Sequence, residues 1–384
     1  MSEHIVIATP FYPPHLGGVE QFSQGLARTL VQMGHRATVV TSREGLQPAR
    51  EQTADGVRVV RLPTHQLLGG RFPLVRKRAG LSELENCFAT DPPTGILANT
   101  RFFLTTACVL EAARRRGLRA VVLDHGSAYI GFGIGAVDWA VRAYEHGVTR
   151  VVRRYEPDFY GVSQMSAEWL GHFGIEARGC IHNAIDAREF RDASSGRDFR
   201  AQLGLDAGEL LAVFTGRLVV TKGVWHVLDI ARRLDEAGAP VCLAMAGDGP
   251  ERERLESSAP ANMHVLGRLH REDVSALLQQ ADLFVFPSEY PEGMPTSIME
   301  AGACGVSSIA TNVGGVRELL PDEDHGIVHG VVDTAQWARE ITWLEEHREE
   351  LARRGARCRE RIEREFSWER TARAVLDACV RAAR

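Results

Sequence analysis

The chain has 384 residues, with 45 Lys and Arg against 50 Asp and Glu, a net charge of -5 and a pI near 6.3. Its length exceeds what one hydrophobic core usually serves and predicts two domains. Hydrophobic content of 44% and charged content of 25% are ordinary for a soluble globular protein. The acidic pI, and a sequence without zinc-finger or RNA-recognition motifs, argue against a nucleic-acid partner.

No apolar run approaches the ~20 residues that span a bilayer, and the N-terminal Met-Ser-Glu-His leads straight into a predicted strand. The seven cysteines are scattered and form no Cys-x-x-Cys pair, which indicates reduced and mostly buried thiols. We therefore expect a cytoplasmic protein without a signal peptide or membrane anchor.

Positive charge gathers in the first half of the chain. Residues 1–190 carry 21 Lys and Arg against 18 Asp and Glu, a net of +3, and the remainder carries a net of -8. Four cations lie among apolar residues in Gly69–Arg78, and Arg114–Arg116 form a second cluster. Such a surface could contact anionic lipid or a lipid-phosphate acceptor at the inner face of the membrane. An ordinary solvated loop and helix end is the favoured alternative.

The first predicted strand, His4–Thr9, precedes a loop rich in proline and glycine and a helix whose apolar residues recur at helical spacing from Val19 to Leu30. The loop has no Gly-x-Gly-x-x-Gly pattern, which disfavours a dinucleotide-binding dehydrogenase. Gly17 and Gly18 stand just before the helix. They fit either a turn with positive φ or a close approach of the backbone to a ligand, and both interpretations stay open.

Further strands of the first half are predicted at residues 37–41, 57–61, 119–124 and 158–162. His125 directly follows the third of these, and the carboxyl end of a parallel strand faces the ligand crevice rather than the core. Taken alone, its position favours a structural histidine over one that binds a ligand. Asp124 is a weaker candidate for the acceptor side.

In the second half, strands are predicted at residues 210–214, 241–246, 263–266, 282–286 and 307–311. Helical patterns separate them, and this alternation is typical of a doubly wound α/β fold. A polar stretch with several turn-forming residues near 184–198 marks the domain boundary.

The loop after the strand 210–214 carries Arg217 and Lys222, two cations that could neutralise a diphosphate. Gly216 and Gly223 let its backbone approach a ligand closely. Solvated surface charge is the commoner explanation for such a pair alone. Loops that follow successive strands of an open sheet meet at one edge, so a site shared with the next motif is expected.

That motif, Glu292–Ala301, follows the strand 282–286. Thr296 or Ser297 begins a predicted helix, whose free N–H groups and positive dipole end could hold a phosphate. Glu292 in the loop and Glu300 in the helix could each accept hydrogen bonds from paired hydroxyls of a ribose or hexose. Taken alone, the two glutamates fit a solvated helix face better.

Together with further motifs, these segments resemble the retaining, nucleotide-sugar-dependent glycosyltransferases of family 4, which have the GT-B fold. The motifs are His15–Glu20, Gly216–Gly223, Ala246–Pro250, Glu292–Ala301, Asn312–Glu318 and Phe366–Trp368. They occur in the family's order over nearly the whole chain. The resemblance implies two doubly wound, Rossmann-like α/β domains facing across a cleft, with the C-terminal helix crossing back. The expected limits are 1–184 with 369–384 for acceptor binding, and 185–368 for donor binding.

The resemblance also implies roles for single residues. His125 would contact the donor sugar, often at its 6-hydroxyl, and Arg217 and Lys222 would stabilise the leaving diphosphate. Glu292 would hold hydroxyls of the sugar and Glu300 those of the ribose. The other implied donor-binding positions are Gly17, Gly18, Gly216, Gly247, Asp248, Gly249, Gly293, Met294, Pro295, Thr296 and Ser297.

The implied reaction moves a hexose-type sugar from a nucleotide-diphosphate sugar, with UDP favoured over GDP, to a glycan, lipid-linked or small-molecule acceptor. Retention by same-face attack is favoured over a covalent route through Glu292. With two cations available for the diphosphate and no Asp-x-Asp sequence recognised in the chain, neither a metal ion nor a cofactor is expected.

Three departures from the family pattern occur at Ala184, at Met294-Pro295 and at Ser307, and the first two loosen the expected geometry beside the sugar. Two other functions stay open. One is another GT-B enzyme, such as a nucleotide-sugar 2-epimerase, and the other is a nucleotide-sugar-binding module without catalysis.

Overall fold

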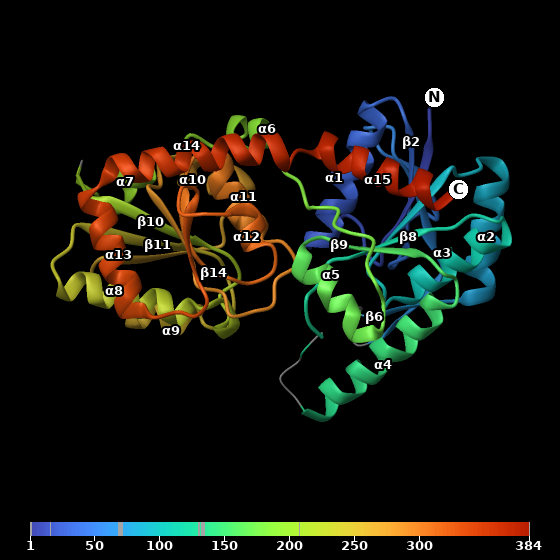
Figure 1. Ribbon diagram of the computed structural model, residues 1–384, viewed down its shortest axis with the longest axis horizontal. Coiled ribbons are helices and arrows are strands. Elements are labelled where there is room, and N and C mark those ends of the chain that lie inside the picture. The colour runs from blue at the N-terminus through green and yellow to red at the C-terminus, as the bar shows by residue number, and fades with distance from the viewer. Residues whose placement is uncertain are drawn as a thin grey trace. The chain divides into compact units, whose positions relative to one another are not determined.

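The computed structural model describes residues 2–15, 17–67, 72–129, 131, 135–206 and 208–383. The chain forms two compact units, one made of Met1–Asn183 with Trp368–Arg384 and the other of Ala184–Ser367. Their limits lie one residue from the expected domain limits. In each unit a mainly parallel sheet is covered by helices (Figure 1), so the predicted doubly wound α/β architecture is confirmed.

The described residues of the first unit form a sheet in the order β3-β4-β2-β1-β7-β8-β9, parallel except between β3 and β4. Its strands are β1 (His4–Ala8), β2 (Arg36–Ser42), β3 (Arg50–Gln52), β4 (Arg58–Leu62), β7 (Gly95–Asn99), β8 (Val121–Asp124) and β9 (Asp158–Gly161). A separate antiparallel pair consists of β5 (Thr64–Leu67) and β6 (Phe72–Val75). The helices are α1 (Gly18–Gln32), α2 (Lys77–Thr90), α3 (Leu104–Arg115), α4 (Gly135–Arg153), α5 (Gln164–Leu170) and α15 (Trp368–Ala383).

The last helix, α15, is part of the first unit and lies beside α1 (Figure 1). The indole of Trp368 fills the space over Gly25, where a Cβ atom would lie 2.3 Å from the ring. Gly95 in β7 meets Cys379 in the same way, at 2.6 Å. Two glycines without side chains therefore let the C-terminal helix pack closely on this unit.

The strand β7 lies in the middle of the first sheet, between β1 and β8, yet the sequence patterns do not predict it. It is the short run Gly-Ile-Leu-Ala-Asn, and Pro92-Pro93 precede it. Glycine, proline and asparagine are all depleted in strands, so its local propensity is low. Burial of all five residues between two parallel neighbours outweighs that propensity.

The second unit has a parallel sheet in the order β12-β11-β10-β13-β14-β15. Its strands are β10 (Leu210–Thr215), β11 (Val241–Ala246), β12 (Met263–Gly267), β13 (Leu283–Phe286), β14 (Ser307–Thr311) and β15 (Gly326–His329). Its helices are α6 (Ala187–Asp192), α7 (Phe199–Leu203), α8 (Val224–Glu236), α9 (Arg252–Ser258), α10 (Arg271–Gln280), α11 (Thr296–Ala303), α12 (Val316–Leu319), α13 (Thr334–Glu346) and α14 (Arg348–Glu365).

The chain order in both sheets reverses at one point, between β1 and β7 in the first unit and between β10 and β13 in the second. Ligands of open α/β sheets bind outside the carboxyl ends of the strands at such a point. The fold thus singles out two places for functional side chains, one in each unit.

Helix caps explain the polar stretch that follows the first unit. Asp186 accepts a hydrogen bond from the N–H of Glu189 at the start of α6, and Asp198 caps α7 in the same way through Ala201. Such caps typically stabilise a helix by about 1 kcal/mol. The turn-forming residues near this boundary therefore begin two short helices rather than a loose linker.

Five of the seven cysteines are buried free thiols, which confirms the expectation of mostly buried thiols. No helix in the described ranges combines the length and the apolarity that crossing a membrane requires. Of the basic stretch Gly69–Arg78, residues 69–71 lie outside the described residues.

Candidate active site

Four loops of the second unit meet at the carboxyl ends of its central strands. The N–H of Glu289, after β13, bonds the carbonyl of Thr221, after β10, at 2.9 Å. The N–H of Gly315, after β14, bonds the carbonyl of Gly293 at 2.9 Å, and Leu218 bonds Asp248 across the loops after β10 and β11 at the same distance. The loops named by the sequence motifs therefore form one connected surface at the switch point.

Glycines make this close approach of loops feasible. A Cβ atom on Gly247 would lie 1.8 Å from the carbonyl oxygen of Gly216, and one on Gly249 would lie 2.3 Å from that of Leu218. Gly223 has a φ of +72°, and its Cβ would lie 2.0 Å from the carbonyl oxygen of Pro287. These positions exclude side chains because backbone packs against backbone.

Lys222 and Glu292, expected from separate motifs, are in direct contact. The ammonium group of Lys222 forms an ion pair with Oε1 of Glu292, and the hydroxyl of Ser288 donates to the same oxygen at 3.0 Å. The ammonium also lies 5.7 Å from the ring centroid of Tyr290. Both charged side chains are mostly buried, so an entering anion would have to share or displace a partly desolvated pair.

Arg217 lies in the same loop as Lys222, but its side chain is exposed and no ion pair joins it to the described residues. Asp248 is exposed as well. Its carboxylate accepts a hydrogen bond from the N–H of Gly249 at 2.9 Å and therefore shapes its own turn. The structure thus places Arg217 on the surface of the site and Asp248 in the framework of a loop.

The helix α11 begins at Thr296, as predicted, with Pro295 as its N-cap residue. Within the described part of the chain no side chain caps this end, while Met294 and Pro295 are buried beneath it. The first N–H groups and the positive end of the helix dipole are therefore left for an anion.

Glu300 lies in the second turn of α11 and is partly buried. Burial raises the pKa of its carboxyl to about 7, and the charge of Arg271 offsets only part of that effect. No described residue hydrogen-bonds this carboxylate. A desolvated carboxylate of this kind is suited to accept hydrogen bonds from a bound ligand.

In the first unit, His125 follows the end of β8 and is held by two neighbours. Its Nε2 atom lies 2.9 Å from Oδ1 of Asn99, the last residue of β7, and its ring meets the ring of Phe22 edge-on with centroids 4.9 Å apart. Desolvation lowers the pKa of the imidazole to about 3, so the ring is neutral at physiological pH.

The interpretation of Asp124 as an acceptor-side group is wrong, because its side chain is fully buried in an ionic cluster. Arg101 bonds Asp124 at 2.5 Å and Glu145 at 2.9 Å, and all three side chains are at most 1% exposed. The guanidinium also lies 3.9 Å from the ring centroid of Phe173. This cluster belongs to the core of the first unit and does not line a surface.

The paired glycines before α1 are not held in a left-handed conformation. Gly17 has a φ of -172° and Gly18 is not among the positive-φ glycines, so the interpretation that requires positive φ is wrong. A Cβ atom on Gly17 would lie 2.2 Å from the carboxylate of Glu20, whereas one on Gly18 would meet nothing within 4 Å. The approach of this backbone to a diphosphate stays a prediction.

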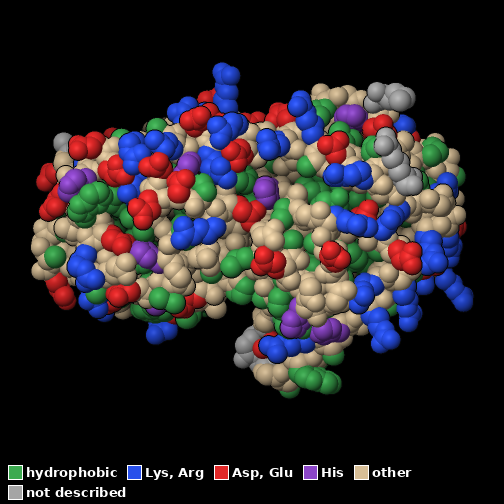
Figure 2. Space-filling model, in the orientation of Figure 1, with side chains coloured by type: hydrophobic (Ala, Val, Ile, Leu, Met, Phe, Trp, Pro, Cys, Tyr) green, Lys and Arg blue, Asp and Glu red, His purple; other side chains and the backbone are tan. Residues whose placement is uncertain are grey.

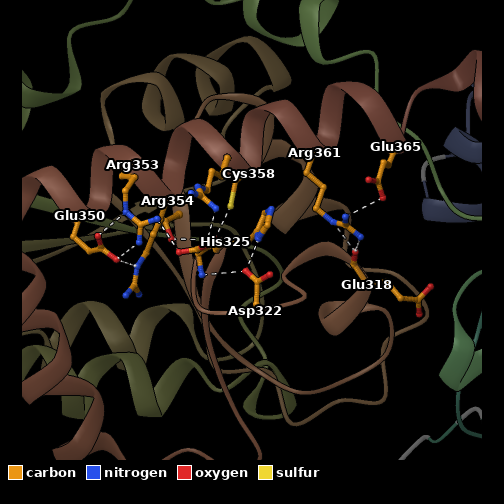
Figure 3. Close-up of polar contacts among 12 residues, drawn as sticks. Glu318, Asp322, His325, Glu350, Arg353, Arg354, Cys358, Arg361 and Glu365 are labelled. Atoms are coloured by element: carbon orange, nitrogen blue, oxygen red, sulfur yellow. Dashed lines mark hydrogen bonds and ion pairs between the residues drawn. The ribbon is translucent and has the colours of Figure 1, made fainter.

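One premise of the expected metal independence, that the chain has no Asp-x-Asp sequence, is wrong, because Asp322–Asp324 is such a sequence. Figure 3 shows the side chain of Asp322 directed at His325, whose Nδ1 atom lies 2.6 Å from Oδ1. Asp324 forms ion pairs with Arg353 at 2.7 Å and with Arg357 at 2.5 Å. Both carboxylates thus have protein partners in a network that anchors α14.

The same network supports one of the motif loops. Arg361 of α14 donates to the carbonyl oxygen of Glu318 at 2.7 and 3.1 Å (Figure 3). Glu318 lies in α12, directly after the loop whose Gly315 bonds Gly293. The helix α14 therefore supports the loop after β14, which in turn contacts the loop that carries Glu292.

The predicted site residues thus fall into two groups. Arg217, Lys222, Glu292, Glu300 and the glycines around them lie at the switch point of the second unit, while His125, Gly17 and Gly18 belong to the first. Sequence reasoning missed Ser288 and Asn99, which bond Glu292 and His125. Ser288 directly follows Pro287 at the end of a predicted strand, and that position could have indicated it; Asn99 ends a strand that local patterns do not predict.

The sequence and the fold match a known class of protein. The model described as Glycosyltransferase Family 4 matches residues 16–189, and the one described as Glycosyl transferases group 1 matches residues 196–361. Sucrose-phosphate synthase from Thermosynechococcus elongatus superposes over 98% of both chains with a TM-score of 0.75 and 18% identity. The Anabaena protein HepE in complex with UDP does so over 98% of both chains with a TM-score of 0.73 and 19% identity. The fold is therefore that of the GT-B glycosyltransferases.

A sequence relative supports the same assignment. A human phosphatidylinositol N-acetylglucosaminyltransferase subunit is 24% identical over 326 residues, which are 84% of this chain and 64% of that protein. The chain thus spans slightly less than two thirds of the length of this relative. With both family matches and the fold in agreement, the chain belongs to the family 4-type glycosyltransferases.

Proposed function

We propose that this protein transfers a hexose-type sugar from a nucleotide-diphosphate sugar to a hydroxyl of a glycan, lipid-linked or small-molecule acceptor. The observation that carries the proposal is the convergence of Lys222, Glu292, Glu300 and the uncapped start of α11 at one switch point. A cation and a helix N-terminus suit a diphosphate, and two carboxylates suit hydroxyls of a ribose and a sugar.

The donor is proposed to be a UDP-sugar, with GDP-sugars as the second candidate. The structural neighbour HepE is a complex with UDP, which supports a uracil nucleotide. On binding, the diphosphate would exchange for Glu292 as the partner of Lys222, and the freed carboxylate would accept hydrogen bonds from the sugar. Glu300 would hold the ribose, because its carboxylate has no protein partner among the described residues.

The chemistry follows from where charge develops. As the glycosidic bond breaks, negative charge grows on the departing diphosphate and the anomeric carbon becomes oxocarbenium-like. Arg217, Lys222 and the start of α11 would stabilise the leaving group, and each such donor contributes about 2.7–4 kcal/mol in comparable sites. We propose same-face attack with retention, in which the leaving phosphate accepts the proton of the acceptor hydroxyl.

The first unit is proposed to bind the acceptor and to contribute His125 to the donor sugar, and the second to bind the donor. Catalysis is proposed to need neither a metal ion nor a cofactor, since cations of the protein face the diphosphate. Full transfer activity after treatment with EDTA is expected. Activity that EDTA abolishes and Mg²⁺ or Mn²⁺ restores would contradict this part of the proposal.

The donor site can be tested by measuring how far UDP-, GDP-, ADP- and TDP-sugars raise the melting temperature of the protein. One nucleotide family is expected to raise the melting temperature, and the shift is expected to disappear in Lys222→Ala and Glu300→Ala. The chain has only two lysines, so Lys77→Ala, which removes an exposed partner of Glu111, is the matched control. Glu346→Ala on the exposed end of α13 controls for the glutamate.

Three results would overturn the assignment in different ways. Binding without transfer to any acceptor in a broad panel would indicate a nucleotide-sugar-binding module. Conversion of the donor sugar to its epimer without an acceptor would indicate an epimerase. Absence of a thermal shift with every nucleotide sugar would remove the basis of the donor site itself.

We further propose that the basic edge formed by α2 and α3 contacts anionic membrane. Figure 2 shows Lys and Arg side chains along that edge. Part of this charge is locally compensated, since Lys77 pairs with Glu111 at 2.8 Å and Arg114 donates to a backbone carbonyl. Cosedimentation with vesicles of phosphatidylglycerol, but not with phosphatidylcholine, is expected at low salt. Equal binding to both would refute the electrostatic contact.

A further inference from the structure

A series of hydrogen bonds determines which ring nitrogen of His125 carries the proton. The hydroxyl of Ser23 bonds the carbonyl oxygen of Val19 at 2.7 Å, and the side chain of Asn99 bonds Ser23 at 2.9 Å. Asn99 in turn meets Nε2 of His125 at 2.9 Å. This series of hydrogen bonds thus runs from the first turn of α1 to His125.

The direction of each bond follows from its end point. A backbone carbonyl only accepts, so the hydroxyl hydrogen of Ser23 must point at Val19. The Ser23 oxygen then accepts from Asn99, which must present its NH₂ group there and its carbonyl oxygen to His125. Because that oxygen also only accepts, Nε2 of His125 must carry the hydrogen. The neutral ring therefore has its lone pair on Nδ1.

Nδ1 is the ring atom left over for a ligand. No described residue hydrogen-bonds Nδ1. The atom is nevertheless not one of the fully buried polar atoms without a partner, so it is not sealed inside the protein. The ring itself cannot turn freely, because Phe22 packs edge-on against it and is in turn backed by Trp368 with ring centroids 5.8 Å apart. The motif Phe366–Trp368 thus places the first residue of α15 against the ring of Phe22.

Hydrogen bonds hold the backbone next to Asn99 in an unusual conformation. Thr100, directly after Asn99, has a φ of +67°, a conformation that β-branched residues rarely adopt. Its N–H continues the sheet to Leu123 at 2.8 Å, and its carbonyl oxygen accepts from Thr106 at 2.8 Å. Strained residues that the surroundings hold in this way cluster at functional sites.

We propose that Asn99 is a positioning residue that fixes His125 as the Nε2–H tautomer, so that Nδ1 accepts a hydrogen bond from a hydroxyl of the donor sugar. The second half of this inference rests on the proposed function, whereas the tautomer concerns the free protein. The two halves can therefore be tested apart.

The tautomer is tested by NMR of the whole chain labelled with ¹⁵N in its histidine rings. The signals of His125 are identified by their loss in His125→Phe. Between pH 6 and 8 we expect one neutral tautomer with the hydrogen on Nε2, and a mixture or a shift to Nδ1–H in Asn99→Leu. Ser23→Ala, which lets the amide of Asn99 turn over, is expected to populate both forms. A wild-type ring protonated at Nδ1, or an unchanged ring in Asn99→Leu, would overturn the proposal.

The matched control is Thr38→Val. Thr38 bonds Nε2 of another buried histidine, His4, at 2.8 Å in the same sheet. Its replacement removes a polar partner of a histidine ring without touching His125. The control is expected to leave both the His125 spectrum and ligand affinity unchanged, which separates positioning from a general loss of stability.

The ligand half is tested with UDP and UDP-glucose as probes. Asn99→Leu is expected to weaken UDP-glucose about tenfold, the effect of one hydrogen bond, while the affinity for UDP stays unchanged. The Nδ1 resonance is expected to move with UDP-glucose and not with UDP. A normal tautomer with no sugar-dependent shift would overturn the donor contact but keep the positioning role. Failure of the wild type to bind either probe would instead count against a uracil-nucleotide donor in the proposed function.

Discussion

The two switch points use cations in opposite ways. Arg101 follows β7 in the first unit and is 1% exposed between two buried carboxylates, whereas Lys222 follows β10 in the second unit and is 26% exposed beside one carboxylate. The charge of Arg101 is neutralised by buried carboxylates of the protein itself. The second can be shared with a ligand, so the first unit is left to present a neutral histidine and the second to present charge.

The largest expected effect comes from removing the buried cation. Arg101→Met would leave Asp124 and Glu145 buried without their guanidinium, and breaking a buried ion pair costs about 3–5 kcal/mol. The free energy of unfolding, measured by urea titration, should fall by that amount. The exposed Arg188→Met variant, which loses only a solvated pair with Asp192, should change it little. Equal effects of the two variants would refute the view that burial sets the role of Arg101.

The complementary change is expected to affect turnover more than stability. Lys222→Met removes the cation from the expected position of the diphosphate and should lower kcat about 10²- to 10³-fold. The free energy of unfolding should fall by less than in Arg101→Met, because Lys222 is 26% exposed and Glu292 keeps its hydrogen bond from Ser288. Steady-state kinetics and urea titration on one preparation give both values. A stability loss as large as that of Arg101→Met would remove the contrast between the units.

The contrast also explains how much the sequence could predict. In the second unit, Arg217, Lys222, Glu292 and Glu300 lie on loops and a helix that follow predicted strands, so the fold class and these positions could be inferred locally. In the first unit, the partner of His125 ends β7, whose short Gly-to-Asn run has no strand signature. The burial of Asp124 depends on Arg101 and Glu145, which are distant in sequence, so no local pattern could show it.

A smaller effect is expected from protons on Glu300. In the unfolded chain its carboxyl releases a proton near the ordinary pKa of 4.5, and in the folded protein near 7. The folded state therefore binds more protons between these values, and the free energy of unfolding should fall by up to about 3 kcal/mol as pH rises across that window. Glu300→Gln should flatten this part of the profile. An unchanged slope would show that other groups cause it.

Donor binding should reverse that protonation. Hydroxyls of a ribose stabilise the ionised carboxylate, so binding at pH 6 should release a fraction of a proton. Calorimetry in two buffers of different ionisation enthalpy measures the release. The same experiment with Glu300→Gln is the control, and proton release that persists in it would assign the effect to another group.

The smallest expected effect tests whether the glycines before α1 serve a ligand. A Cβ atom on Gly18 meets nothing within 4 Å, and alanine in a helix is favoured over glycine by roughly 0.5–1 kcal/mol. Gly18→Ala should therefore raise stability slightly. If the backbone approaches the diphosphate, the added methyl group should also raise the KM for the donor. Gly147→Ala in α4, equally open, should give the gain in stability alone. The same KM in both variants would mean that Gly18 serves only the start of the helix, and donor binding would then depend on the second unit's charges without this loop.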